Sequence, residues 1–158
     1  MFDEELKVFL IALMPLLETR ASIPFGIFIA NLPISEVLAL SIVGNIAPAP
    51  FLLWGLSAFE KWVLSGYGGL RGVMRIIYQR LLIRVRLKGM KYIRKYGLLG
   101  LTIFVAIPLP GSGVWTGCLV SHVMGLEPWK SIIAIGVGSL IASLLILASA
   151  LGVISLWS

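Results

Sequence analysis

Two side chains of opposite charge, Glu18 and Arg20, stand two residues apart in an apolar stretch that Pro15 and Pro24 bracket. A charged residue at the centre of a membrane-spanning helix costs about 2.5–3.5 kcal/mol, so a pair kept in such a stretch indicates a site. The guanidinium of Arg20 suits a phosphate or carboxylate, and the carboxylate of Glu18 suits a proton. An anion and a proton that share one site are the minimum that a proton-coupled carrier needs. The alternative is that the two charges neutralise each other and hold the local structure.

A second polar interruption, Pro-Leu-Pro-Gly-Ser-Gly at residues 108–113, breaks another apolar stretch. Ser112 is expected to cap a half-helix that runs from Val114, and Ser22 is expected to cap one with Pro24 near its first turn. Where two half-helices begin at one point, their unpaired N–H groups and dipoles favour an anion. The predicted substrate site comprises Glu18, Arg20, Ser22, Pro24, Asn45, Pro108, Pro110, Gly111, Ser112 and Gly113.

The composition is that of a membrane protein. Of the 158 residues, 59% are apolar and 13% are charged, whereas a soluble domain carries about 25% charged residues. A spanning helix takes about 20 residues, so the length allows one domain with a handful of membrane elements. The acidic N-terminus, Met1–Glu5, is unlike the basic start of a secretory signal peptide, and we expect it to be part of the mature structure.

Residues for the common enzymatic chemistries are missing from the sequence. It has no glycine-rich phosphate loop and no His-Glu-x-x-His segment, and one histidine, His122, would have to serve any catalytic triad. The single cysteine, Cys118, excludes a disulfide within the chain and a cysteine-built metal site. We therefore expect neither an enzyme nor a bound metal or cofactor. His122 lies at the end of the third apolar stretch and is expected to be an interface residue, with a proton relay as the alternative.

Basic residues are concentrated between residues 61 and 95. That segment holds ten lysines and arginines and no acid, whereas the rest of the chain holds three basic and seven acidic residues. Basic loops beside spanning helices stay in the cytoplasm, so we predict that residues 61–97 are cytoplasmic. Their helical spacing predicts an amphipathic helix on anionic lipid headgroups, with a solvated loop as the alternative. Nucleic-acid binding is not expected, because it would require this segment to be free of the membrane.

The sequence divides into two similar halves, each with a broken apolar stretch, a proline-bearing connection and a plainer apolar stretch. A shift of 94 residues places Val43-Gly-Asn45 on Val137-Gly-Ser139. This order predicts one membrane domain with repeats at residues 1–60 and 98–158, joined by the connector at 61–97. Asn45 would either line the pathway or pair with backbone groups that nearby prolines free. The apolar stretches are Leu6–Ile29, Val37–Ala58, Leu98–Met124 and Ile132–Leu151.

The first stretch, Leu6–Ile29, can form one helix or a hairpin. A straight helix would be about 36 Å long, enough to cross, but Glu18 and Arg20 would not face each other and Pro24 would remove a backbone bond. A re-entrant hairpin gives two arms that each reach about 13 Å, with Pro15–Ile23 at the apex. We favour hairpins in both halves. One hairpin and one crossing per half predict both termini outside, whereas four full crossings would put both termini inside.

Two segments, Pro15-Leu-Leu-Glu-Thr-Arg-Ala-Ser-Ile-Pro-Phe-Gly26 and Phe104-Val-Ala-Ile-Pro-Leu-Pro-Gly-Ser-Gly-Val-Trp-Thr-Gly117, resemble the small multidrug export protein family, a short branch of the DedA (VTT-domain) superfamily. The resemblance covers nearly the whole chain. It implies two inverted repeats, each with a re-entrant hairpin and a transmembrane helix, and proton-coupled movement of lipids such as polyprenyl phosphates between leaflets. It also implies that Glu18 is the family's acidic residue and Pro110-Gly111 its second turn. DedA proteins usually carry arginines around that turn, where this chain has Ala106, Ser112 and Gly113.

The predicted protein is therefore an all-α, multi-pass integral protein of the cell membrane, in which a basic amphipathic connector joins two inverted repeats. We expect a flippase-like transporter that moves an anionic lipid between leaflets, with protons as the coupling ion and membrane lipids as partners. The alternatives are export of small amphipathic molecules and a structural or assembly role without transport. A small-residue face on the last stretch suits helix packing, and it is also compatible with a homodimer. That face comprises Gly138, Ser139, Ala142 and Ser143.

Overall fold

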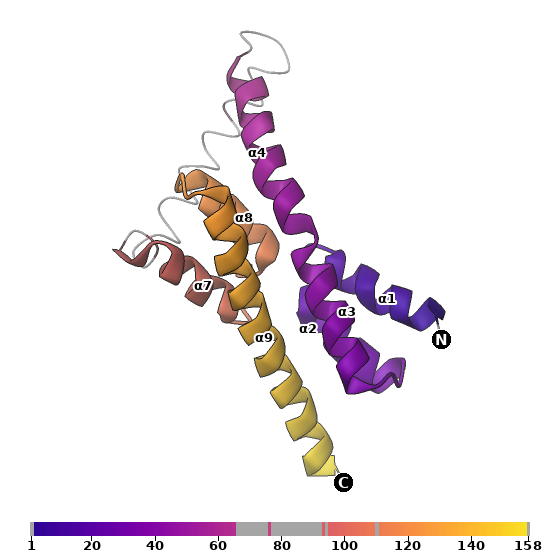
Figure 1. Cartoon of the computed structure of the whole chain (residues 1–158). Coiled ribbons are helices and arrows are strands. Elements are labelled where there is room, and N and C mark those ends of the chain that lie inside the picture. Colours follow the sequence, from indigo (N-terminus) through magenta and orange to yellow (C-terminus); the bar gives the residue numbers. More distant parts are fainter. Residues whose placement is uncertain (1, 66–75, 77–92, 94, 110, 158) are drawn as a thin grey trace.

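The structure, a computed structural model, describes residues 2–65, 76, 93, 95–109 and 111–157, and every regular element among them is a helix (Figure 1). The predicted all-helical class is confirmed for these residues. Most of the predicted connector helix, residues 61–97, lies outside them. The first half contains α1 (Phe2–Leu13), α2 (Glu18–Pro24), the π-helix η1 (Phe25–Ile29), α3 (Ile34–Ile46) and α4 (Pro48–Leu64). The second half contains α7 (Leu98–Ala106), α8 (Val114–Val123) and α9 (Pro128–Trp157).

Among the described residues, two helices are long and apolar enough to cross a membrane. The first runs from Ile34 to Trp62, 29 residues through α3 and α4, and the second from Pro128 to Gly152, 25 residues of α9. At about 1.5 Å per residue, they measure about 43 Å and about 37 Å, more than the hydrocarbon thickness of about 30 Å. In Figure 1 the far end of α4 and the C-terminal end of α9 lie at opposite ends of the molecule. The chain is a helical membrane protein with two candidate spans.

The outer faces of these long helices are apolar. Phe51 of α4 is 80% exposed, and Ile133 and Trp129 of α9 are 66% and 62% exposed. A water-soluble monomer rarely exposes continuous apolar surface of this kind, whereas a bilayer requires it of the helix faces that contact lipid. The exposed surface therefore agrees with the composition.

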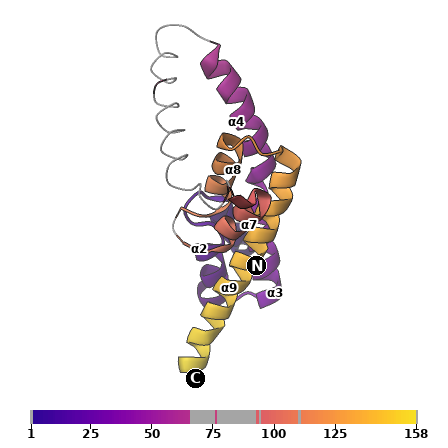
Figure 2. The same ribbon diagram turned by 90° about the vertical axis from the view of Figure 1, so that its left-hand side faces the viewer.

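The remaining helices are too short to cross a bilayer singly. α1 has 12 residues, α7 has 9 and α8 has 10, while α2 and η1 have 7 and 5; a crossing takes about 20 residues. They pack in pairs, α1 on α2 and α7 on α8. Figure 2 shows the short helices gathered around the middle of the two long ones.

The first apolar stretch is broken, as expected, but the break is shorter than expected. The turn between α1 and α2 occupies residues 14–17, whereas the predicted apex was Pro15–Ile23. Pro15 has no N–H for a helical bond, and Leu16 adopts a left-handed φ of 78° that interrupts the helix. Most of the predicted apex is therefore helical.

Two glycines allow helices to cross at close range. A Cβ added to Gly44 would lie 2.7 Å from the carbonyl oxygen of Phe9 in α1, and one added to Gly138 would lie 2.7 Å from that of Thr102 in α7. α3 therefore crosses α1, and α9 crosses α7, with the backbones almost in contact. The face that carries Gly138 serves packing within the chain. Its other members are also buried, namely Ser139, Ala142 and Ser143.

The two halves interlock through their helices. α2 of the first half packs on α9 of the second, α8 of the second packs on α4 of the first, and α3 crosses α9. One buried apolar cluster lies in the first half, around Val8, Ile23 and Val37. A larger cluster joins α4 to the second half, and it includes Leu53, Leu101, Val105, Val114 and Ile135. This packing brings both chain breaks to the same place.

Candidate functional site

Glu18 lies where the two breaks meet. It is the first residue of α2 and adopts a φ of 50°, a left-handed conformation that costs a non-glycine residue about 1–2 kcal/mol. Its side chain is 6% exposed. The carboxylate lies against Gly113, where an added Cβ would be 1.6 Å from Oε2. Only glycine at position 113 therefore leaves room for the carboxylate.

The same carboxylate occupies the N-terminus of α8. The backbone N–H groups of Val114 and Trp115, in the first turn of that helix, are directed at Glu18. A helix N-terminus is a ready site for an anion. The sequence predicted this half-helix as part of a substrate-anion site. In the structure the chain's own carboxylate occupies that position, so a substrate anion would have to bind beside Glu18 or replace it.

Arg20 pairs with Glu18 despite the spacing of two residues. Its Nη2 lies 4.0 Å from Oε2 of Glu18, and it donates a hydrogen bond of 3.4 Å to Oγ of Ser112. On a regular helix the two side chains would point apart. The left-handed backbone at Glu18 removes that constraint, because the carboxylate leaves the chain in a different direction. The two charges are therefore close enough to interact, as the neutralising alternative from the sequence requires.

Ser112 organises the loop between α7 and α8. Its Oγ lies within hydrogen-bonding distance of the carbonyl oxygens of Ile107 and Leu109, and it accepts a bond of 3.2 Å from the N–H of Leu109. The predicted role of Ser112 as a helix cap is wrong: the residue that precedes α8 is Gly113, and it makes no side-chain cap bond. The loop carbonyls compete successfully for the hydroxyl group. Gly111 has a φ of 87°, which glycine adopts without strain.

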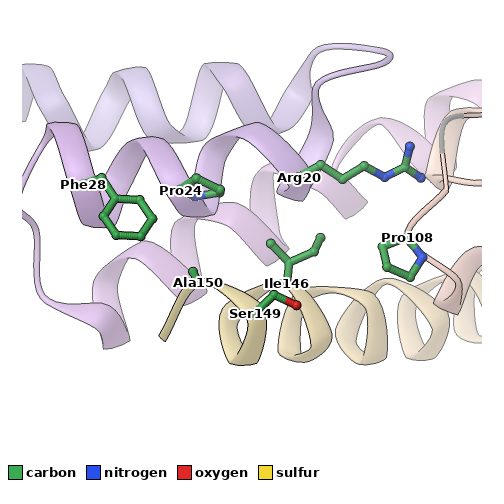
Figure 3. A pocket seen from close by; sticks show the side chains of 7 residues that line it. All are labelled: Arg20, Pro24, Phe28, Pro108, Ile146, Ser149 and Ala150. Atoms are coloured by element: carbon green, nitrogen blue, oxygen red, sulfur yellow. The ribbon is translucent and has the colours of Figure 1, made fainter. Parts of the chain in front are cut away.

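An apolar groove of about 380 Å³ opens beside this charged pair (Figure 3). Arg20 and Pro108 lie at one end, and Phe28 and Ala150 lie at the other. Among the described lining residues, Ser149 supplies the one hydroxyl group, and it donates to the carbonyl oxygen of Leu145 within α9 at 2.8 Å. Arg20 is the one cation among those same residues, and it also contacts Glu18. The groove is lined by Arg20, Pro24, Phe28, Pro108, Ile146, Ser149 and Ala150.

Two other predicted site residues lie outside the groove lining. Ser22 is a mid-helix residue of α2, not a cap, and its hydroxyl donates to Oγ of Ser41 in α3 at 2.8 Å. Asn45 donates from Nδ2 to Oγ of Ser139 in α9 at 2.9 Å. Its Oδ1 has no hydrogen-bond partner among the described residues. Both side chains join helices to one another. Pro110 falls outside the described residues.

A contact between the two breaks was not predicted. Nε1 of Trp115 in α8 donates to the carbonyl oxygen of Leu13, at the end of α1, with a distance of 3.2 Å. This bond satisfies one of the carbonyls that a helix end leaves free. Nothing in the sequence paired Trp115 with the end of the first helix. Phe28, Ile146 and Ala150 of the groove gave no signal, because apolar residues of these types occur throughout the chain.

His122 connects α8 to α4 through polar contacts. Its Nε2 lies 2.8 Å from Oε2 of Glu60 on α4, and its Nδ1 lies 3.5 Å from Oγ of Ser57. The contact joins the end of α8 to α4. Among the described residues, no three of His, Cys, Asp and Glu are grouped closely enough to hold a metal ion.

Residues 18–145 match the family model described as "Putative small multi-drug export protein". The chain belongs to this family. The match begins at Glu18, directly after the first break, and includes the second break, so the charged pair and its partner loop at residues 107–113 lie within the family's own region. A small multi-drug export protein is a transport protein and not a class of enzyme, which agrees with the expected transporter. No curated protein and no solved structure matches the chain.

Proposed function

We propose that this small multi-drug export protein transports amphipathic anions, binding the charged group at Arg20 and the apolar part in the adjoining groove. The observation that carries the proposal is the position of Arg20. Among the residues that the structure describes, it is the one cation lining a mostly apolar groove of about 380 Å³, and its side chain is 20% exposed. A guanidinium at the end of an apolar surface complements a phosphate or carboxylate that carries a hydrocarbon chain.

Glu18 would link transport to protons. Its carboxylate and a substrate anion compete for the same guanidinium, because Oε2 lies 4.0 Å from Nη2 of Arg20. Protonation of Glu18 removes the competing charge and favours the anion. By linkage, the bound anion favours protonation of Glu18 to the same extent. A proton and an anion would therefore bind together, which corresponds to cotransport in one direction.

The proposal includes two inverted repeats with re-entrant hairpins, as in the DedA (VTT-domain) superfamily. The order of short helix, turn, short helix and long helix occurs twice. Gly44 and Gly138, 94 residues apart, make equivalent close crossings onto α1 and α7. Asn45 and Ser139, also 94 residues apart, touch each other, as equivalent residues do beside a two-fold axis. In this arrangement the basic connector is cytoplasmic and both termini are outside.

Among substrates, a polyprenyl phosphate fits the proposal in having one phosphate and a long apolar chain. The second candidate from the sequence, export of other small amphipathic molecules, uses the same groove, and the fixed charge of Arg20 favours anions over cationic drugs. The third candidate is a structural role in which Glu18 and Arg20 only stabilise the turn. The carrier and the structural candidates differ in whether a neutral Glu18 abolishes the effect of a pH gradient on transport or only lowers stability.

The test is leaflet exchange of a labelled polyprenyl phosphate in proteoliposomes, with and without a pH gradient. Wild type should exchange the lipid faster when a gradient is imposed, and Glu18→Gln should abolish the acceleration. Glu36→Gln is the matched control, because Glu36 is an exposed acid in the first turn of α3, and it should behave as wild type. A labelled polyprenol without the phosphate should not be moved. No exchange above empty vesicles, from folded and inserted protein, would refute the lipid substrate.

A further inference from the structure

The groove has a counterpart interface in the other half of the molecule. At that interface α8 and α4 are joined by polar contacts. The groove lies between α2 with η1 and the C-terminal part of α9. The corresponding pair is α8 and α4, which also pack across the halves. The separation of 94 residues that relates Asn45 to Ser139 also relates Phe28 to His122. Phe28 stands at one end of the groove, 47% exposed.

At the counterpart of Phe28 the interface is bridged by polar contacts. Nε2 of His122 lies 2.8 Å from the Glu60 carboxylate, and Nδ1 lies 3.5 Å from Oγ of Ser57. The side chain of His122 is 10% exposed and that of Glu60 is 34% exposed. The bridge therefore stands at the edge of the interface, where it covers what lies deeper between α8 and α4.

Directly beneath the bridge lies Cys118, one helical turn earlier on α8. Its side chain is fully buried, and Sγ lies 3.9 Å from the carbonyl oxygen of Ala49 on α4. Ala49 and Leu53 of α4 belong to the same buried cluster as Cys118. Four residues before Cys118, Val114 begins the turn whose N–H groups face Glu18. The line along α8 from His122 through Cys118 therefore leads to the charged site.

We propose that His122, Glu60 and Ser57 form a gate on the connector side of the molecule. In this structure the gate is closed while the groove on the opposite side is open, which is the asymmetry that alternating access requires of two equivalent interfaces. When the gate opens, α8 separates from α4, and the apolar surface around Cys118 becomes the path of the amphipathic anion. The role in transport rests on the proposed function, whereas the closure itself does not.

The native cysteine reports on the gate without added labels. Cys118 is the single cysteine of the chain, so alkylation by a membrane-impermeant maleimide measures how often the path beside it is open. In proteoliposomes, trypsin cleavage of the basic connector identifies the molecules whose connector side faces the reagent. Wild type should be alkylated slowly. His122→Ala and Glu60→Ala should be alkylated about tenfold faster from the connector side, since each removes a charge-assisted bond that favours the closed state.

Two controls separate gating from general loosening. Glu127→Gln removes an exposed carboxylate that pairs with Lys130 at 2.6 Å, in the connection from α8 to α9, and should not change the alkylation rate. Glu60→Asp keeps the charge but withdraws the carboxylate by one methylene group. It should raise the rate about threefold, and it continues the test if Glu60→Ala fails to fold. Melting temperatures identify the variants that fold.

Alkylation needs no transported substrate, so its outcome is independent of the transport assay. Faster alkylation in the His122 and Glu60 variants, together with no lipid exchange by wild type, would retain the gate and reject the lipid carrier. Unchanged alkylation in folded His122→Ala and Glu60→Asp would overturn the gate. Equal acceleration by Glu127→Gln, or acceleration only from the side opposite the connector, would overturn it as well.

Discussion

The two chain breaks are alike in architecture and different in chemistry. The first contributes ionisable side chains, Glu18 and Arg20, from the start of α2 directly after the turn, where Glu18 has a φ of 50°. The second contributes no ionisable side chain among residues 107–113; it supplies the space at Gly113, the hydroxyl of Ser112 and the N–H groups at the start of α8. Neither break is a site by itself. The charges come from one half of the chain, and the groups that hold them come from the other.

A substitution that removes a charge of the first half should have the largest effect on stability. Arg20→Gln leaves the nearly buried carboxylate of Glu18 without its cation, and removal of one partner of such a pair costs about 3 kcal/mol or more. The double variant Glu18→Gln with Arg20→Gln should recover most of this stability and none of the transport. The measurement is the free energy of unfolding in mixed micelles for wild type, the two single variants and the double variant, which together form a double-mutant cycle. Additive effects of the two substitutions would contradict the pairing.

A substitution that fills the space beside Glu18 in the second half should have a somewhat smaller effect on stability. Gly113→Ala places a methyl group 1.6 Å from the position of Oε2, so the carboxylate must move away from the α8 N–H groups. We expect a loss of about 1–3 kcal/mol in the free energy of unfolding, together with loss of transport. Gly55→Ala is the control, because an added Cβ at Gly55 of α4 meets nothing within 4 Å. A neutral Gly113→Ala would show that the carboxylate is not confined there.

The bond that joins the two breaks can be removed alone. Trp115→Phe keeps an aromatic ring but loses the Nε1–H that donates to the carbonyl oxygen of Leu13 at 3.2 Å. One such bond contributes about 1 kcal/mol, and the melting temperature should fall accordingly. Transport should slow while remaining proton-dependent, because Glu18 and Arg20 are retained. Loss of proton dependence in this variant would mean that Trp115 acts on the charges directly.

The smallest change in transport is expected at Ser22. The sequence placed it in the substrate site, but its hydroxyl bonds to Ser41 at the packing of α2 on α3. Ser22→Ala should lower stability by about 1 kcal/mol and leave the affinity for the transported anion unchanged. Transport titrations against substrate concentration check this. A weaker apparent affinity in Ser22→Ala would show that Ser22 contributes to substrate binding.

The parts of the fold that follow from single residues could be predicted from the sequence. Prolines and intramembrane charges mark both breaks, and two long apolar runs mark the two candidate spans. The pairing of Glu18 with Arg20 was one of two alternatives from the sequence, but the geometry that permits it could not be predicted, because it depends on one left-handed backbone angle that the residue type does not favour. The cap expected at Ser112 failed for a related reason: the loop carbonyls that compete for the hydroxyl appear only when the loop is folded.

The groove could not be predicted from the sequence, because most of its lining residues are apolar types that occur throughout the chain. Ile146 and Ala150 lie on α9, whose residues are apolar along most of its length. They line a groove because α9 lies opposite Arg20 and Pro24 of α2 and beside Pro108 of the loop before α8, which is known only from the folded chain. Arg20 was found early because a charge stands out where apolar residues surround it.

The amide of Asn45 affects how firmly α3 and α9 are held at their crossing. Nδ2 gains a bond to Ser139, while Oδ1, in the part of the chain that the structure describes, gains none. A typical bond contributes about 1 kcal/mol, and an unsatisfied buried acceptor costs about 1–3 kcal/mol. The polar contact at the centre of the molecule therefore fixes the register of the two spans without adding cohesion.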